Sequence, residues 1–430
     1  MERDLMKRLV EWKNGKRRKP LLLQGARQVG KTWLVKEFGR REFTNTAYIN
    51  FDENHTIHSV FDGDLDTDRL IIAIKAQTGL DISADDSLIV FDEVQECPRA
   101  LTSLKYFCEN APEYAIIATG SLLGVAMHPG TTFPVGKVDR MTLYPLSFSE
   151  FLRAQGKTGL VDLLNSDDEV SKASFHGEYV DFLRQYYFVG GMPEAVDVFL
   201  EERSFSRVSS IHKTILDMYR QDFSKHADSS LIPRLNMVWS SIPAQLAKEN
   251  KKFIYGVVRQ GARAKDYELA IQWLEDSGLI HKVFRTKKAG IPLSFYADQS
   301  SFKIYMADIG LLCAMSQINE RVVIEGNRLF VEFKGALTEQ FVLQQLVTMR
   351  DQPVYYYSAE NARTEIDFLV DGPECPIPIE VKAEENLRAK SLRVFCAEND
   401  LTGVRFSMSG YRDQGWMKNI PLYDVGAIIP

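Results

Sequence analysis

One short stretch combines glycine, lysine and threonine at a spacing that can hold a chain of phosphates. Residues 25–32 read Gly-Ala-Arg-Gln-Val-Gly-Lys-Thr and fit the pattern G-x-x-x-x-G-K-[ST], between a short apolar run and a helical pattern. Glycine adopts backbone angles that strain other residues, so the N–H groups of such a loop can turn inward around phosphates at a helix N-terminus. We expect Lys31 to neutralise the β and γ phosphates and the Thr32 hydroxyl to bind Mg²⁺.

A second candidate functional feature is a pair of acidic residues at the end of an apolar run. Residues 88–93 read Leu-Ile-Val-Phe-Asp-Glu, which predicts a buried strand that brings Asp92 to the sheet edge where ligands bind in open α/β folds. We expect Asp92 to contact Mg²⁺ and Glu93 to orient and deprotonate an attacking water. An acidic pair after a strand can instead cap the next helix. The expected cofactors are ATP and Mg²⁺, and the expected binding residues are Gly25, Ala26, Arg27, Gln28, Val29, Gly30, Lys31, Thr32, Trp33 and Asp92.

Phosphoryl transfer also needs groups that sense the γ phosphate and stabilise charge in the transition state. Residues 115–121 predict a strand that ends in small polar residues, so the hydroxyl of Thr119 or Ser121 could sense the phosphate, although a plain strand-end turn explains the same residues. Lys137 and Arg140 are the nearest candidate cations. If either acts on a neighbouring subunit, the protein must form a homo-oligomer.

The alternation of apolar runs and helical patterns predicts an α/β fold with a parallel sheet covered by helices on both faces. Helical patterns then continue to about residue 227. Two helices and two short strands follow in the order of a winged helix, and the chain ends with a helix, a strand pair and another helix. The expected strands lie at residues 21–24, 47–51, 87–91, 115–119, 279–284, 293–296, 365–370 and 379–382.

Composition limits the classes of protein that this chain can belong to. Hydrophobic residues make up 45% and charged residues 26%, which is typical of a globular protein, and a net charge of −6 excludes a basic nucleic-acid coat. No apolar run is long enough to cross a bilayer, and the first residues do not read as a signal peptide. The five cysteines include no C-x-x-C pair, which favours a reducing compartment. We therefore expect a cytoplasmic protein with no membrane partner.

Four polar residues near the C-terminus form a second constellation. Glu339 falls on an expected helix, Asp367 on one strand, and Glu380 and Lys382 on the next strand, where residues two apart share a face. Brought together, the carboxylates could hold Mg²⁺ or Mn²⁺ against a scissile phosphate, with Lys382 positioning water. A half-exposed strand pair with its charges outward gives the same pattern, so both interpretations stay open.

Two basic segments could contact the phosphates of DNA. Residues 13–19 form the densest basic cluster, which can equally be a solvated loop before the first strand. The expected recognition helix at residues 265–277 carries four acids, which speaks against base readout in the major groove. Its aromatic residues Tyr267 and Trp273 lie at helical spacing and are expected in the core. The basic residues expected around the wing are Lys282, Arg285, Lys287 and Lys288.

These motifs together resemble a family of bacterial and archaeal AAA-superfamily ATPases, in which a helical region, a winged helix and a nuclease-like domain follow the ATPase. The resemblance spans essentially the whole chain and rests on residues 25–32, 48–52, 91–95, 119–121, 143–148, 190–195, 303–312 and 379–382. It implies ATP binding and hydrolysis, and it implies a PD-(D/E)XK fold for the C-terminal part. The family often has proline at the position of Ala26 and arginine at that of Lys137, which leaves Arg140 the better finger candidate.

We therefore expect four parts: a parallel-sheet AAA-like P-loop core at residues 1–155, a helical lid at 156–228, a winged helix at 229–316 and an α/β nuclease-like domain at 317–430. The expected function is ATP hydrolysis that couples nucleotide state to DNA binding or processing. One alternative is an ATP-dependent regulatory switch whose C-terminal domain binds a partner and cuts nothing. Another is a nucleotide-binding module with negligible hydrolysis.

Overall fold

The computed structural model describes residues 1–121, 134–248, 251–319, 331–350, 352–359, 364–383 and 389–428, with the main chain alone at 331–333. The chain divides into two compact units. The N-terminal unit comprises Glu2–Tyr144 and Asp276–Leu279. The C-terminal unit comprises Pro145–Glu275 and Ile280–Pro430, together with Met1.

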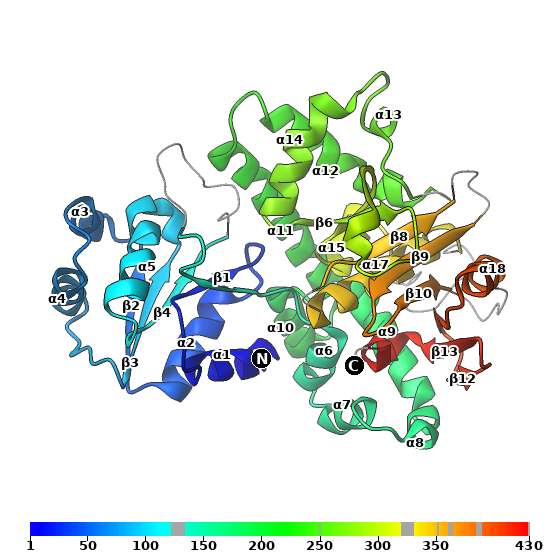
Figure 1. Ribbon diagram of the computed structural model, residues 1–430, viewed down its shortest axis with the longest axis horizontal. Coiled ribbons are helices and arrows are strands. Elements are labelled where there is room, and N and C mark those ends of the chain that lie inside the picture. The colour runs from blue at the N-terminus through cyan, green and yellow to red at the C-terminus, as the bar shows by residue number, and fades with distance from the viewer. Residues whose placement is uncertain are drawn as a thin grey trace. The chain divides into compact units, whose positions relative to one another are not determined.

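The N-terminal unit is built on a five-stranded parallel sheet with the strand order β2-β3-β4-β1-β5 (Figure 1). Every residue of the inner strands β3 and β4 is buried, as their continuous apolar sequences predict. The strands are β1 (Leu21–Gln24), β2 (Asn45–Asn50), β3 (Ser87–Asp92), β4 (Ala115–Thr119) and β5 (Asp139–Thr142). The first four confirm the strands expected in this part of the sequence. The edge strand β5 was not expected, because Asp-Arg-Met-Thr contains no apolar run.

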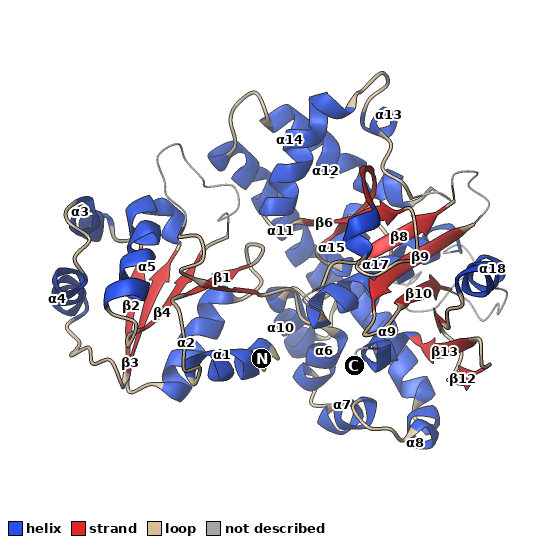
Figure 2. Ribbon diagram, viewed as in Figure 1, coloured by secondary structure: helices blue, strands red, loops and turns tan. Residues whose placement is uncertain are grey.

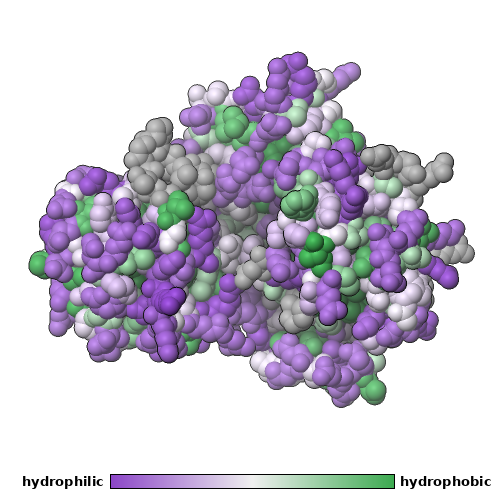
Figure 3. All heavy atoms as spheres, viewed as in Figure 1, coloured by the Kyte–Doolittle hydropathy of each residue, from purple (hydrophilic) through white to green (hydrophobic). Residues whose placement is uncertain are grey.

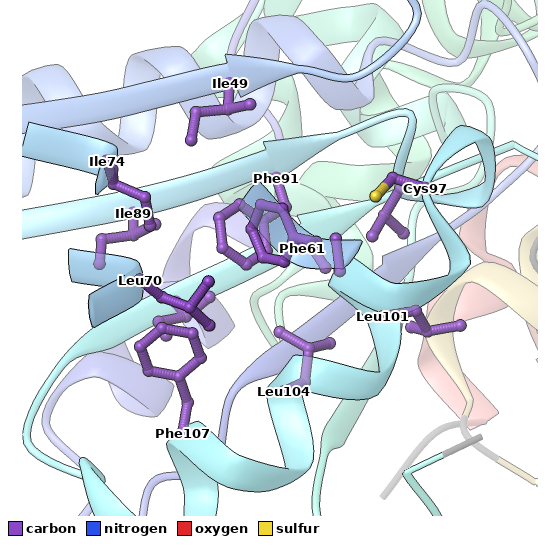
Figure 4. Packing of buried hydrophobic residues seen from close by; sticks show 14 of the residues in the cluster. Ile49, Phe61, Leu70, Ile74, Ile89, Phe91, Cys97, Leu101, Leu104 and Phe107 are labelled. Atoms are coloured by element: carbon purple, nitrogen blue, oxygen red, sulfur yellow. The ribbon is translucent and has the colours of Figure 1, made fainter. Parts of the chain in front are cut away.

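Helices cover this sheet and bury its side chains. On one face, α3, α4 and α5 pack against the strands through a cluster that includes Phe61, Leu70, Phe91 and Phe107 (Figure 4). Helices α1 and α2 pack on each other through Trp12 and Phe38, whose ring centroids lie 6.4 Å apart. The helical segments are α1 (Leu5–Lys13), α2 (Lys31–Glu42), η1 (His55–Ile57), α3 (His58–Asp62), α4 (Thr67–Thr78), η2 (Val94–Glu96) and α5 (Pro98–Asn110).

The C-terminal unit begins with a run of helices, in agreement with the helical pattern of the sequence (Figure 2). Tyr267 and Trp273 of α14 are buried, which confirms that they belong to the core. The helices are α6 (Phe148–Ala154), α7 (Thr158–Leu164), α8 (Glu169–Ser174), α9 (His176–Val189), α10 (Pro193–Glu202), α11 (Phe205–His226), α12 (Ile232–Leu246), α13 (Tyr255–Val258), α14 (Ala264–Asp276), α15 (Ile309–Met315), α17 (Val331–Met349) and α18 (Lys390–Asn399), with 3₁₀ segments η3 (Leu293–Tyr296) and η5 (Leu422–Ile428).

An eight-stranded mixed sheet, with the order β12-β13-β11-β10-β9-β8-β6-β7, runs through this unit. Strand β6, which matches the wing strand expected at residues 279–284, pairs with β7, and it also pairs in parallel with β8. The expected wing and the C-terminal strands thus share one sheet. The strands are β6 (Ile280–Thr286), β7 (Ala297–Met306), β8 (Tyr355–Ser358), β9 (Glu365–Asp371), β10 (Pro376–Val381), β11 (Gly403–Ser407), β12 (Arg412–Asp413) and β13 (Met417–Pro421).

One expected strand is wrong. Residues 293–296 form the 3₁₀ segment η3, and strand β7 starts only at Ala297. Pro292 precedes η3 and has no N–H to give to a neighbouring strand, while the N–H of Leu293 donates to the Asp371 carboxylate at 3.0 Å. The apolar run therefore turns before it enters the sheet.

Helix α17 connects the mixed sheet to the helices through amide side chains. Gln340 bonds both backbone groups of Met306 on β7, at 2.9 and 2.7 Å, and Gln344 accepts from the N–H of Ile309 at 2.9 Å. Gln345 accepts from the N–H of Phe148 on α6 at 2.8 Å. These buried bonds satisfy backbone groups that the sheet and helices leave unpaired, so α17 fixes the two layers together.

Hydrophilic side chains cover most of the face seen in Figure 3, with apolar residues in small separate groups. Among the residues that the structure describes, none of the helices combines the length and the apolar character that crossing a membrane requires.

Candidate nucleotide-binding site

The loop between β1 and α2 has the backbone geometry that its glycines predict. Gly25 has a φ of 147° and Gly30 a φ of 94°, a region that favours glycine. A Cβ on Gly25 would lie 2.2 Å from the carbonyl oxygen of Leu143, so a side chain cannot fit there without moving the backbone. Gly30 is the N-cap residue of α2, and the loop therefore delivers the free N–H groups of a 12-residue helix to one place.

Lys31 lies inside this loop. Its ammonium donates to the carbonyl oxygens of Gly25 and Ala26 at 2.8 and 2.9 Å and to Ser121 Oγ at 2.9 Å. The residue is only 6% exposed. Burial lowers the pKa of Lys31 to about 8, against the opposing effect of the Glu93 and Asp92 carboxylates. At neutral pH the group remains mostly protonated, so it presents a nearly dehydrated positive charge at the centre of the loop.

Asp92 brings three elements together at the carboxyl edge of the sheet. Its Oδ2 accepts from Thr32 Oγ1 at 2.8 Å, at the start of α2, and from the Tyr48 hydroxyl of β2 at 2.5 Å. Its Oδ1 accepts from Thr119 Oγ1 at the end of β4. The carboxylate is therefore held in one orientation beside the Thr32 hydroxyl, an arrangement of hard oxygen ligands that suits Mg²⁺.

Glu93 follows directly in a left-handed conformation, with φ 51° and ψ 46°. Such a backbone costs about 1 kcal/mol or more for a residue with a Cβ, and it is common at functional sites. Glu93 precedes η2 but its side chain makes no capping bond, which disfavours the helix-cap interpretation. Instead its Oε2 accepts from Gln95 Nε2 at 2.5 Å.

The expected finger residues lie elsewhere. Arg140 is exposed on β5, where it lies opposite Leu22 of β1. The last residue of β1, Gln24, lies opposite Thr142, which is two residues after Arg140. This places Arg140 about 7 Å behind the end of β1 along the strands. Lys137 forms an ion pair with Glu109 at 2.9 Å. A finger role for Arg140 or Lys137, in the same or in a neighbouring subunit, stays a prediction. Of the other expected contacts, Arg27 and Trp33 are exposed, while Val29 is fully buried.

Sequence reasoning missed two residues that shape this site. Tyr48 orients Asp92, but a tyrosine within a strand reads as a core residue. Arg3 donates to the carbonyl oxygens of Val29 and Tyr144, at 2.8 and 2.5 Å, and so ties the loop to the strand that follows β5. An arginine near the N-terminus carries no sequence signal for such a contact.

The comparisons with known proteins agree with this geometry. Residues 17–152 match an AAA domain. The N-terminal unit thus carries an AAA domain, in line with its motifs. Two further matches, each a "Domain of unknown function", cover residues 180–322 (DUF8612) and 334–429 (DUF4143). The search of curated proteins found no match.

Several solved structures match this chain at low similarity. A Walker-type ATPase of Pyrococcus abyssi is 14% identical, with a TM-score of 0.44 over 73% of this chain and 95% of that one. The Orc1 protein of Aeropyrum pernix in complex with DNA is 12% identical, with a TM-score of 0.29 over 73% and 91%. The Cdc6p protein of Pyrobaculum aerophilum is 11% identical, with a TM-score of 0.23 over 72% and 88%.

Outside the AAA domain, the structure places the four expected C-terminal residues in one electrostatic network. Lys382 Nζ lies 2.6 Å from Glu380 Oε1, which confirms that these two side chains point together. Asp367 Oδ2 accepts from the N–H of Val381 at 2.7 Å, and Glu339 accepts from Tyr305 at 3.1 Å. Burial and the carboxylates of Glu339 and Glu380 raise the pKa of Asp367 to about 8.

Two lysines that the sequence did not single out neutralise this network. Lys251 pairs with Glu339, and Lys303, which is 1% exposed, pairs with Glu365 at 2.7 Å. Burial alone would lower the pKa of Lys303, but Glu339, Glu365 and Asp367 raise it overall. In the described ranges no three His, Cys, Asp or Glu side chains form a group that could hold a metal ion. Lys251 and Lys382 pair with Glu339 and Glu380, whereas Asp367 accepts from a backbone N–H. A metal-binding role for Glu339, Asp367, Glu380 and Lys382 stays a prediction.

Replacing Lys303 by methionine should lower the free energy of unfolding by about 3 kcal/mol, because it leaves the carboxylates of a buried network without their cation. Chemical denaturation of the purified protein measures this loss. Lys265→Met on the exposed face of α14 is the control and should change stability by less than about 0.5 kcal/mol. A loss for Lys303→Met no larger than that of the control would mean that the network contributes nothing to stability.

Proposed function

We propose that the N-terminal unit binds ATP with Mg²⁺ and hydrolyses it to ADP and phosphate. The observation that carries this proposal is the meeting of a buried ammonium, from Lys31, with a hydroxyl–carboxylate pair, from Thr32 and Asp92, around a glycine-flexed loop. The match of residues 17–152 to an AAA domain supports the same function.

The residues of the loop would bind the nucleotide. The free N–H groups at the start of α2 and the ammonium of Lys31 bind the β and γ phosphates. Thr32 Oγ1 and Asp92 hold Mg²⁺, and the hydroxyls of Tyr48 and Thr119 keep the Asp92 carboxylate turned toward it. Ser121, which accepts from Lys31 at 2.9 Å, is suited to detect whether the γ phosphate is present.

Glu93 would perform the proton transfer. Bound ATP supplies a γ-phosphoryl group that passes to water, and Mg²⁺ neutralises charge on its oxygens. Gln95 donates to Glu93 Oε2, which leaves Oε1 to accept the proton of the attacking water. Water oxygen bonds to the γ phosphorus, the bond to the β–γ bridging oxygen breaks, and Glu93 later returns the proton to solvent.

The direct test is phosphate release from ATP by the purified chain. We expect multiple turnovers that require Mg²⁺ and stop when the metal is chelated. Tight ATP binding with no release above the background rate would overturn the hydrolase proposal and leave a nucleotide-binding module.

Replacing Tyr48 by phenylalanine should raise the Mg²⁺ concentration needed for half-maximal ATP turnover about tenfold, because second-sphere groups orient metal ligands. The measurement is a Mg²⁺ titration of the ATPase rate. Tyr106→Phe removes a hydroxyl from an exposed tyrosine of the same unit and should leave the curve unchanged. An unchanged Mg²⁺ requirement in Tyr48→Phe would show that Asp92 needs no support from Tyr48.

For the C-terminal unit, we favour a regulatory role in which nucleotide state controls the binding of a partner without nucleic-acid cleavage. Glu339, Glu365 and Glu380 each pair with a lysine, and this specific observation favours a structural network over a nuclease. A nuclease assay with Mg²⁺ and Mn²⁺ separates the two functions. Cleavage that disappears in Lys382→Ala would restore DNA processing as the function of this unit.

The ion pairs of the expected wing residues also disfavour DNA binding through the wing. Lys282 pairs with Glu275 at 3.0 Å, and Arg285 pairs with Asp298 at 2.6 Å. Neighbouring carboxylates therefore neutralise two of the four expected wing cations. A nucleic-acid partner would find better-placed positive charge elsewhere on the chain.

A further inference from the structure

The basic segment at residues 15–19 lines a hollow of about 590 Å³ at the amino end of the parallel sheet. Gly15, Lys16, Arg17, Arg18 and Lys19 form one wall, and Cys108, Pro112 and Glu113 complete the lining. Lys19 is followed by Pro20 and β1, whose other end carries the phosphate loop. A four-residue strand is about 13 Å long, so this hollow is separate from the candidate nucleotide site.

Bonds to three other segments hold the basic loop in place. Arg18 donates to the carbonyl oxygens of Lys13 and Glu113, at 3.1 and 2.7 Å, and its guanidinium lies over the Trp12 ring at 5.5 Å. Lys19 donates from Nζ to the carbonyl oxygen of Gly136 at 2.9 Å. The backbone of the loop is thus fixed before any ligand arrives, which lowers the entropy that binding would cost.

Within this fixed loop, Lys16 and Arg17 are exposed and have no ion pair in the part of the chain that the structure describes. The other two cations of the loop, Arg18 and Lys19, both bond backbone oxygens. Two adjacent free cations beside two further positive groups make a local positive surface on a chain of net charge −6. The carboxylate of Glu113 is the one acidic group among the lining residues.

We propose that this basic hollow binds the phosphate backbone of a nucleic acid, without preference for sequence. A nucleic-acid duplex carries one negative charge per roughly 1.7 Å of its axis, so neighbouring cations on a short loop meet several phosphates at once. The lining contains no exposed large apolar side chain of the kind that inserts into a bilayer, which favours nucleic acid over a lipid surface. This inference goes beyond the proposed ATP hydrolysis and does not depend on it.

The test compares Lys16→Glu/Arg17→Glu with a matched control, Lys213→Glu/Arg220→Glu, in which one lysine and one arginine on the exposed face of α11 undergo the same change of charge. Fluorescence anisotropy of a labelled duplex and of one of its strands gives Kd as a function of salt, without nucleotide. The hollow variant should bind at least about tenfold more weakly, with a salt slope reduced by about two. The control should differ from wild type by less than about twofold.

Two controls keep the result specific. Lys16→Gln/Arg17→Gln should show a smaller loss in the same direction, which excludes a fold disturbed by charge reversal. All variants should keep the wild-type ATPase rate. The ATPase assay therefore tests the proposed hydrolysis, and the anisotropy assay tests nucleic-acid binding, independently of each other. Equal affinity of the hollow and control variants would overturn the proposal. Wild-type binding to phosphatidylserine vesicles with none to nucleic acid would overturn it as well.

Discussion

Replacing Lys31 by alanine is expected to weaken ATP binding at least about a hundredfold, because the substitution removes a buried, hydrogen-bonded charge from the phosphate loop. The ammonium of Lys31 sits among the carbonyl oxygens of Gly25 and Ala26 and is nearly shielded from water. In that setting its attraction for a polyphosphate is much stronger than that of a surface lysine. Equilibrium titration with a fluorescent ATP analogue measures the loss.

Lys75→Ala is the matched control in the same unit, since Lys75 pairs with Asp81 at the surface of α4, where an ion pair contributes little. Its ATP affinity should stay within about twofold of wild type. If folded Lys31→Ala bound ATP within about threefold of wild type, the loop would not be the triphosphate site, whatever its geometry.

The phosphate loop and four of the five strands of the AAA domain could be predicted because their signals are local. A strand buried on both faces is a continuous apolar run, and a loop that wraps phosphates needs glycine at fixed positions. The same reasoning failed for β5, whose polar residues lie at the sheet edge and gain their conformation from pairing with β1. Edge pairing depends on the neighbour more than on the strand's own composition.

The partners of the site could not be predicted, because they come from distant parts of the chain. Tyr48 lies 44 residues before Asp92 and reaches it only because β2 and β3 are adjacent, with Asn50 in register with Asp92. Sequence spacing carries no information about which tyrosine of an apolar strand turns its hydroxyl toward a carboxylate.

For the C-terminal residues Glu339, Asp367, Glu380 and Lys382, the sequence predicted part of the local geometry but not the cations around the carboxylates. The strand pair and the common face of Glu380 and Lys382 followed from period-two geometry alone. Lys303, however, sits in the apolar sequence Phe-Lys-Ile-Tyr-Met of β7 and gave no sign that it would face three carboxylates. A motif of acids and one lysine thus cannot distinguish a metal site from an ionic network until the remaining cations are placed.

Replacing Glu93 by glutamine is expected to lower ATP turnover about a thousandfold while ATP affinity stays within about threefold, because the amide cannot accept the proton of the attacking water. Glutamine has the same length and keeps an oxygen for the bond from Gln95. It also faces the same left-handed backbone, so the substitution adds no new strain at φ 51°. Single-turnover phosphate release with bound ATP isolates the chemical step from nucleotide exchange.

Glu96→Gln removes a carboxylate three residues further along, at the end of η2, and should leave both turnover and affinity near the wild-type values. The combination of intact binding and lost turnover in Glu93→Gln alone assigns the proton transfer to this carboxylate. Turnover that survives in Glu93→Gln would instead mean that another group activates the water. Affinity lost together with turnover would mean that Glu93 binds the nucleotide or its metal, since a general base contributes to the transition state and not to the ground state.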